Sequence, residues 1–402
     1  MTEAARDACW WQTLSEDFYR QADGTTLDSQ HPLKIRSTAA LDHVGRTCLG
    51  VMLSSGLAPR ALTPGWAALE RERMRFYSPF AEAGDIDAVF ATPPVNQLVT
   101  DQILEKNEWR PTGAACRLLR FDSPFEPLNP ALRESWAAQR NNSVAQAQYW
   151  THRNGPRPTL IFIHGYFASP YWLNSRMFAL PWLFRQGYDI ALYTLPFHGR
   201  RAGPRDPFSG YGFVSGGVAG LNESMLQAVF ELRILVGELL RRGAPAVGIS
   251  GLSLGGYLSA LLACVDDRLS FCIPNSPLVV PVDMALEWWS LRWLLRAAMR
   301  FQDVSLQDMR QALALHSPLS YAPRIAPNRL LVIGGAGDRF TPPRYVRLLH
   351  EHWKGSRLHW FPGNHMIHLQ RGRYLRIMKW FMDHHTRPPG ADEEQLAEAL
   401  AQ

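Results

Sequence analysis

The chain has 402 residues, of which 46% are hydrophobic and 19% charged, and its formal net charge is +6. This length suits one large domain with a substantial addition, or two domains. Apolar runs are of strand length and far from the roughly 20 residues that span a bilayer. The basic excess is almost all arginine, with no block of like charges, which is typical of a GC-rich bacterial genome rather than a nucleic-acid surface. We therefore predict a globular protein with no membrane span and no nucleic-acid partner.

The N-terminus and the cysteines indicate the compartment. The first residues lack a basic segment followed by an apolar one, so no signal peptide is predicted. The five cysteines are an odd number and form no C-x-x-C motif. We expect free thiols, a cytoplasmic location, and neither a metal site nor an organic cofactor. The adjacent histidines His384 and His385 are interpreted as exposed residues.

Residues 1–110 are the least informative part of the chain. Helix-like stretches at 41–53, 66–76 and 95–106 alternate with turn-rich segments. No period recurs, which excludes a repeat array or a propeller. We predict an N-terminal helical extension that packs on the main domain.

From residue 111 the pattern changes to strands alternating with helices, which predicts an α/β fold with a mostly parallel sheet flanked by helices. The predicted core comprises residues 111–276 and 329–390, interrupted by a helical, aromatic lid insertion at 277–328 and followed by a C-terminal tail at 391–402. The first two strands should be half-exposed. Predicted strands are 116–121, 145–150, 159–164, 189–195, 246–249, 269–273, 329–334 and 357–361, and predicted helices are 171–185 and 222–242.

The run GLSLGG at residues 251–256 lies between a predicted strand and a predicted helix. This is the setting of a nucleophile elbow, a sharp turn that exposes a serine and needs glycines on either side. In a chain of this length G-x-S-x-G arises by chance roughly one time in seven, so its context decides. Ser250 lacks the second glycine. Ser253 is therefore the predicted nucleophile.

Two later loops supply the partners that a serine nucleophile needs. Asp338 follows the predicted strand 329–334, and His365 follows the predicted strand 357–361. A base must take the serine proton during attack, which is the role predicted for His365, and Asp338 would fix the imidazole tautomer and stabilise the imidazolium. His368 is the rival base, without the Gly-x-His setting, and Asp283 is the rival acid.

From residue 116 to the C-terminal helix the chain resembles the α/β-hydrolase superfamily, whose members carry serine, acid and histidine in this order. The resemblance extends to the HGYF run at 164–167, which is similar to the superfamily's H-G-x turn. It implies an oxyanion hole formed by the backbone N–H groups of Tyr166 and Leu254. His164 is interpreted as a structural residue of that loop.

Within the superfamily, four short stretches are similar to the alpha/beta hydrolase domain-containing protein 18 family. They are residues 171–172 with the following helix, the P-x-x-G-x-R turn at 196–201, the two glycines at 216–217, and residues 248–250 before the elbow. The first hundred residues add nothing to this likeness.

Two groups of residues are candidates for substrate binding. The turn at 196–201 fits a structural H-G-x turn, or else Arg200 or Arg201 contacts an anionic part of the substrate. In the insertion, Arg292, Arg296 and Arg300 recur every fourth residue between tryptophans and leucines that include Trp288 and Trp289. That helix could contact an anionic membrane surface, line an acyl-chain pocket or pack on the core as a cap.

Together these patterns predict a serine hydrolase that cleaves a carboxylic ester or related acyl bond through an acyl-enzyme. The tryptophan-rich insertion favours small-molecule esters with acyl chains, or lipids. Two alternatives remain open: an acyltransferase that uses the same triad, and a non-catalytic binding protein on a hydrolase scaffold. A peptidase is disfavoured because no propeller repeat is present. The oligomeric state is not encoded in these patterns.

Overall fold

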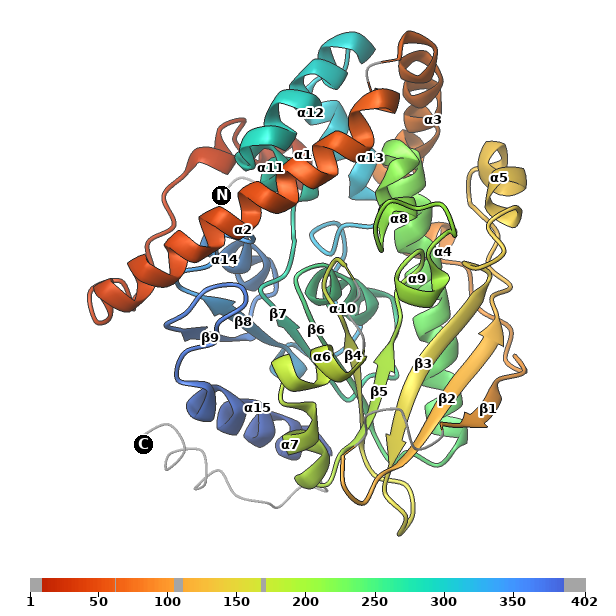
Figure 1. Cartoon of the computed structure of the whole chain (residues 1–402), viewed down its shortest axis with the longest axis vertical. Helices are drawn as coiled ribbons and strands as arrows, with labels where there is room; N and C mark the ends of the chain where they lie inside the picture. The colour runs from red at the N-terminus through yellow and green to blue at the C-terminus, as the bar shows by residue number, and fades with distance from the viewer. Residues whose placement is uncertain (1–8, 62, 105–110, 168–170, 387–402) are drawn as a thin grey trace.

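The computed structural model describes residues 9–61, 63–104, 111–167 and 171–386; the predicted tail at 391–402 lies outside them. The centre of the fold is a nine-stranded sheet in the order β1-β2-β3-β5-β4-β6-β7-β8-β9 (Figure 1). The strands are β1 (Thr100–Ile103), β2 (Ala115–Asp122), β3 (Val144–Thr151), β4 (Thr159–Ile163), β5 (Asp189–Tyr193), β6 (Val247–Leu252), β7 (Phe271–Asn275), β8 (Leu331–Gly335) and β9 (Arg357–Phe361).

The sheet is parallel from β5 to β9 and antiparallel at the end that contains β1, β2 and β3. The prediction of a mostly parallel sheet is thus confirmed. The prediction of a helix at 95–106 is wrong, because residues 100–103 form β1. This short strand has four exposed residues, and its pairing with β2 outweighs the local sequence preference. β3 is buried along most of its length rather than half-exposed.

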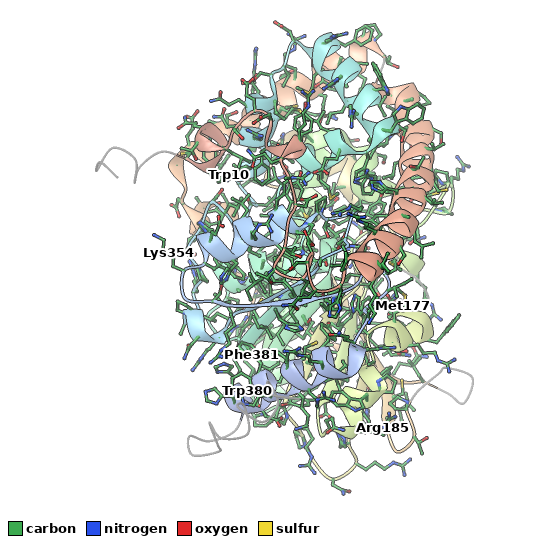
Figure 2. The ribbon with its side chains drawn as sticks, turned by 90° about the vertical axis from the view of Figure 1, so that its left-hand side faces the viewer. Trp10, Met177, Arg185, Lys354, Trp380 and Phe381 are labelled. Carbon is green, nitrogen blue, oxygen red and sulfur yellow. The ribbon has the colours of Figure 1, made fainter. Side chains whose placement is uncertain are left out.

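Helices cover both faces of the sheet, which divides the core in two. On β4, Ile161 and Ile163 face one apolar cluster, whereas Leu160 and Phe162 face the other, as the alternation of a strand requires. The first cluster includes residues of α9 (Gly217–Arg241), α10 (Leu254–Val265) and α14 (Pro343–His352). The second is formed with α6 (Tyr171–Met177), α7 (Leu180–Arg185) and α15 (Arg371–Thr386). Figure 2 shows Phe381 and Trp380 of α15 in the lower half of the molecule, well below Trp10.

Two segments far apart in the sequence lie side by side above the carboxyl ends of the parallel strands (Figure 1). One is N-terminal and includes α1 (Trp10–Thr13), α2 (Pro32–Ala61), α3 (Pro64–Ala83) and α4 (Ile86–Val89). The other is the insertion, with α11 (Pro281–Glu287), α12 (Trp289–Gln302) and α13 (Leu306–Ala314). We call α2, α3 and α11 to α13 the cover. The remaining α-helices are α5 (Arg133–Ala137) and α8 (Tyr211–Ser215).

Among the described residues, none of the helices combines the length and the apolar character that crossing a membrane requires.

Candidate active site

Ser253 occupies the turn between β6 and α10 with φ 57° and ψ −114°, a backbone conformation that non-glycine residues rarely adopt. Glycines make this turn possible. A Cβ on Gly255 would lie 2.1 Å from the carbonyl oxygen of Ile163, and one on Gly251 would lie 2.7 Å from that same oxygen. The strained serine and its flanking glycines match the expected elbow. Ser250 is buried within β6 and donates to the carbonyl of Ile273, which removes it as a nucleophile.

Asp338 and His365 meet across the loops that follow β8 and β9. The Nδ1 atom of His365 lies 2.7 Å from Oδ2 of Asp338. The other carboxylate oxygen accepts hydrogen bonds from the backbone N–H groups of Phe340 and Thr341 at 2.9 and 2.8 Å. With both oxygens engaged as acceptors, the proton of the imidazole is held at Nδ1 and Nε2 is left as the basic nitrogen.

The charges of this pair stabilise each other. Burial alone would raise the pKa of Asp338, but the facing His365 and the hydrogen bonds to the carboxylate lower it below its ordinary value. Burial alone would lower the pKa of His365, but the charge and the hydrogen bond of Asp338 raise it. The site is therefore arranged to accept a proton at His365 while Asp338 stays ionised.

Ser253 and His365 both line a cavity of about 760 Å³, whose wall is mostly apolar. The predicted oxyanion residues Tyr166 and Leu254 line it as well. Within the part of the chain that the structure describes, neither backbone N–H donates a hydrogen bond to the protein. The structure thus brings the predicted nucleophile, base and oxyanion donors to one cavity. Apolar wall residues from the cover include Leu49, Met52, Leu291, Leu294, Leu295 and Met299.

His164 has the structural role that was expected of it. Its Nε2 accepts a hydrogen bond from the backbone N–H of Leu195 at 3.1 Å, so its Nδ1 carries the proton and donates to the carbonyl of Gly165 at 2.6 Å. Burial lowers the pKa of His164 to about 4, which keeps the ring neutral. The ring thereby ties the loop after β4 to the end of β5.

The prediction that Arg201 contacts substrate is wrong. Its side chain is buried and makes a bidentate ion pair with Glu231, at 2.6 and 2.8 Å. The same guanidinium donates to the carbonyls of Asn142 and Thr194. Arg200 is exposed and does not belong to the cavity wall. The turn at 196–201 therefore fits the structural interpretation.

The two tryptophans predicted to bind substrate occupy different positions. Trp288 is buried, lines the cavity and packs edge-on against Phe340, with 5.6 Å between ring centroids. Trp289 is 62% exposed and is not part of the cavity wall, so its assignment to the substrate pocket is wrong. The basic stripe of α12 is partly used within the protein, because Arg292 donates to the carbonyl of Leu286.

The rival acid and base are engaged elsewhere. Asp283 forms a buried ion pair with Arg310, with contacts of 2.9 and 2.5 Å. His368 packs against the rings of Phe361 and Tyr374. Burial, with the nearby His365, lowers the pKa of His368 to about 4. Neither lines the cavity that contains Ser253.

Two polar residues at the site were not found from the sequence. The hydroxyl of Thr341 lies 3.0 Å from Oδ2 of Asp338 and 3.2 Å from Nδ1 of His365. Asp42 of α2 is buried, and its Oδ2 accepts hydrogen bonds from the backbone N–H groups of His365 and Arg339 at 3.0 and 2.9 Å. The position of Thr341, three residues after Asp338, was a usable signal. Asp42 belongs to no motif and gave none.

Sequence comparison finds relatives of this chain but no family. No family model matches the chain. Uncharacterized proteins of Mycobacterium tuberculosis strains CDC 1551 and H37Rv are 30% identical to it over 255 residues, which is 61% of this chain and 58% of theirs. The aligned part of the chain thus spans little more than half the length of these relatives.

Solved structures identify the fold. Acetyl xylan esterase 1 from Thermoanaerobacterium sp. JW/SL YS485 superposes with a TM-score of 0.54 at 17% identity, over 78% of this chain and 98% of that one. An acetyl xylan esterase from Paenibacillus sp. R4 gives 0.54 at 15% identity, over 77% and 94%. At such identities the likeness concerns the fold alone. The chain has the α/β-hydrolase fold, as the resemblance implied.

Proposed function

We propose that the protein is a serine hydrolase that cleaves a carboxylic ester or a related acyl bond. One observation carries the proposal: a serine on a strained strand-to-helix turn lines the same cavity as His365, which is hydrogen-bonded to the buried Asp338. The two acetyl xylan esterases that share the fold agree with this class of reaction.

In the proposed mechanism, Nε2 of His365 takes the proton of Ser253 as the serine oxygen attacks the substrate carbonyl. Asp338 stabilises the imidazolium that forms. The backbone N–H groups of Tyr166 and Leu254 stabilise the oxyanion, each worth about 10²–10³ in rate. The imidazolium then protonates the leaving group, and water, activated by His365, releases the acyl group from Ser253.

The proposed substrates are small-molecule esters with acyl chains, or lipids. The cavity is large enough for a drug-sized ligand or a chain of many carbons, and its wall is mostly apolar. On the outer surface of α12, Trp289, Trp293 and Phe301 are each more than half exposed, which supports a peripheral membrane contact. The cytoplasmic location stays a prediction from the sequence.

Three finer assignments are also proposals. The insertion 277–328 is proposed to act as a lid because α12 contributes to the cavity wall. The division into an extension at 1–110, a core and a lid follows the element boundaries, although β1 pairs the end of the extension with the core sheet. Membership of the alpha/beta hydrolase domain-containing protein 18 family rests on the four sequence stretches alone.

The test is labelling by an active-site phosphonate together with turnover of an ester panel graded by chain length and headgroup charge. Wild-type protein should be labelled, and Ser253→Ala should not be. Labelling that persists in Ser253→Ala would disprove the assignment of the nucleophile. A wild-type protein that reacts with no phosphonate would favour a binding protein, and product analysis with a competing alcohol separates hydrolysis from acyl transfer.

A further inference from the structure

One face of helix α2 contacts both loops that carry the acid–base pair. Thr38, Asp42 and Arg46 are spaced by four residues, so they form one stripe along the helix. The carbonyl of Thr38 accepts a hydrogen bond from the side-chain amide of Asn364 at 2.8 Å. Arg46 donates to the carbonyl of Arg339 at 2.8 Å. The helix thus binds the residue after Asp338 and the residue before His365.

Asp42 is at the middle of this stripe and links the two loops through a single atom. Its Oδ2 accepts the N–H of His365, from the loop after β9, and the N–H of Arg339, from the loop after β8. These N–H groups belong to the base itself and to the neighbour of the acid. Since the Asp42 side chain is buried, water is a poor substitute for it as an acceptor.

The loops and the helix approach each other too closely for larger residues. A Cβ on Gly337 would lie 2.7 Å from Oγ1 of Thr38 and 2.9 Å from the carbonyl oxygen of Ile35. One on Gly45 would lie 3.0 Å from the ring of Phe340, which stacks on His365 with centroids 5.0 Å apart. The contact is therefore a fitted interface and not a chance approach of a surface helix.

We propose that Asp42 is a positioning residue of the active site: its carboxylate fixes the backbone of His365 relative to that of Asp338, and its negative charge favours the protonated base. This inference rests on the proposed function for its kinetic consequence. Helix α2 therefore helps to position the acid and the base, although the nucleophile, acid and base all lie in the sheet-based core.

The electrostatics of the cluster agree with this role. Burial and the charge of Asp338 raise the pKa of Asp42 to about 6, against the lowering effect of its two backbone hydrogen bonds. The ionisable groups that act on Asp42 are Asp338 and His365 from the core and Arg46 from its own helix. His365 in turn faces Asp338, Asp42 and His368. We therefore expect the pKa of His365 to fall when the charge of Asp42 is removed.

The decisive experiment is an NMR titration of His365 in protein with isotope-labelled histidine, with the signal assigned by loss in His365→Gln. Asp42→Asn keeps an oxygen acceptor for both N–H groups but removes the charge. It should lower the pKa of His365 and leave the thermal midpoint at pH 8 unchanged or higher, because a buried charge is lost. Asp17→Asn, which removes the same charge from an exposed residue, is the matched control and should change neither quantity.

The kinetic arm is the rate of phosphonate labelling. Asp42→Ala leaves two buried N–H groups without an acceptor and should slow labelling about ten- to hundred-fold through misplacement of His365. Asp42→Asn should restore most of the labelling rate at high pH.

An unchanged His365 titration in Asp42→Asn, or undiminished labelling of folded Asp42→Ala, would overturn the proposal. If wild type is not labelled at all, the proposed function fails, while the titration still decides the role of Asp42. If Asp42→Ala does not fold, Asp42→Asn decides it.

Discussion

The sheet-based core and the cover contribute to the same cavity in different ways. The core supplies the proposed nucleophile, acid and base from loops at the carboxyl ends of β6, β8 and β9, where a short sequence motif determines the position of each residue. The cover supplies apolar wall and, through Asp42, a buried contact to the acid–base loops. The proposed chemistry thus depends on a few local motifs, whereas the enclosure of the cavity depends on helices that lie hundreds of residues apart in the sequence.

The largest effect should come from the core. Asp338→Asn removes the charge that holds His365 in the productive tautomer, since an amide can present its NH₂ group to Nδ1. We expect kcat on a good ester to fall about 10⁴-fold with little change in KM. Steady-state kinetics with purified variant, checked by circular dichroism for folding, measures this. If kcat fell no further in Asp338→Asn than in Asp42→Asn, the core and the cover would not differ in their contribution to catalysis.

The second prediction tests a part of the core that builds the fold and not the site. Arg201→Met leaves Glu231 as a buried carboxylate without its bidentate partner. The free energy of unfolding should fall by about 3–5 kcal/mol, as measured by chemical denaturation. Arg140→Met, at an exposed position, should change it by less than about 0.5 kcal/mol. If the folded Arg201→Met protein discriminated headgroup charge differently from wild type, its assignment as a structural residue would be wrong.

The triad residues and Arg201 show what could and could not be predicted from the sequence. Ser253, Asp338 and His365 were recognisable because each follows a strand at a short, fixed spacing, so local sequence determines their place at the sheet edge. Arg201 resembled a substrate-binding arginine because its partner Glu231 is thirty residues away on α9, and burial is not visible in a turn motif. Trp288 and Trp289 are neighbours in the sequence, but Trp288 is buried against Phe340 and Trp289 is exposed, which the sequence alone does not reveal.

Asp42 was out of reach for a related reason. It is separated from His365 by more than three hundred residues, and helix periodicity predicts only that Thr38, Asp42 and Arg46 share a face. β1 is similar, because pairing with β2 and not its own composition makes residues 100–103 a strand. In both cases the structural role depends on a tertiary contact with another segment, which local sequence patterns do not reveal.

The third prediction concerns pH. His365 must be neutral to act as the base, and Asp338 raises its pKa above the ordinary value in spite of burial. As pH falls through that pKa, kcat/KM should drop about tenfold per pH unit, with the acid limb at higher pH than for an unperturbed histidine. Asp338→Asn and Asp42→Asn should both move the limb to lower pH. If Asp42→Asn left the acid limb at its wild-type pH, the pKa of His365 would be set by groups of the core alone.

The smallest effects should arise in the cover, where adjacent tryptophans form a matched pair. Trp288→Leu enlarges the cavity beside Phe340 and should shift the ratio of kcat/KM between long-chain and short-chain esters about tenfold toward the longer chain, because an apolar pocket discriminates by a few kcal/mol at most. Trp289→Leu changes a side chain that is 62% exposed, so chain-length preference in detergent-free buffer should stay as in wild type. Equal shifts in both variants would mean that the outer surface of α12 also meets substrate. A shift in neither would place the acyl chain elsewhere in the cavity, and the wall formed by the cover would then serve stability rather than selectivity.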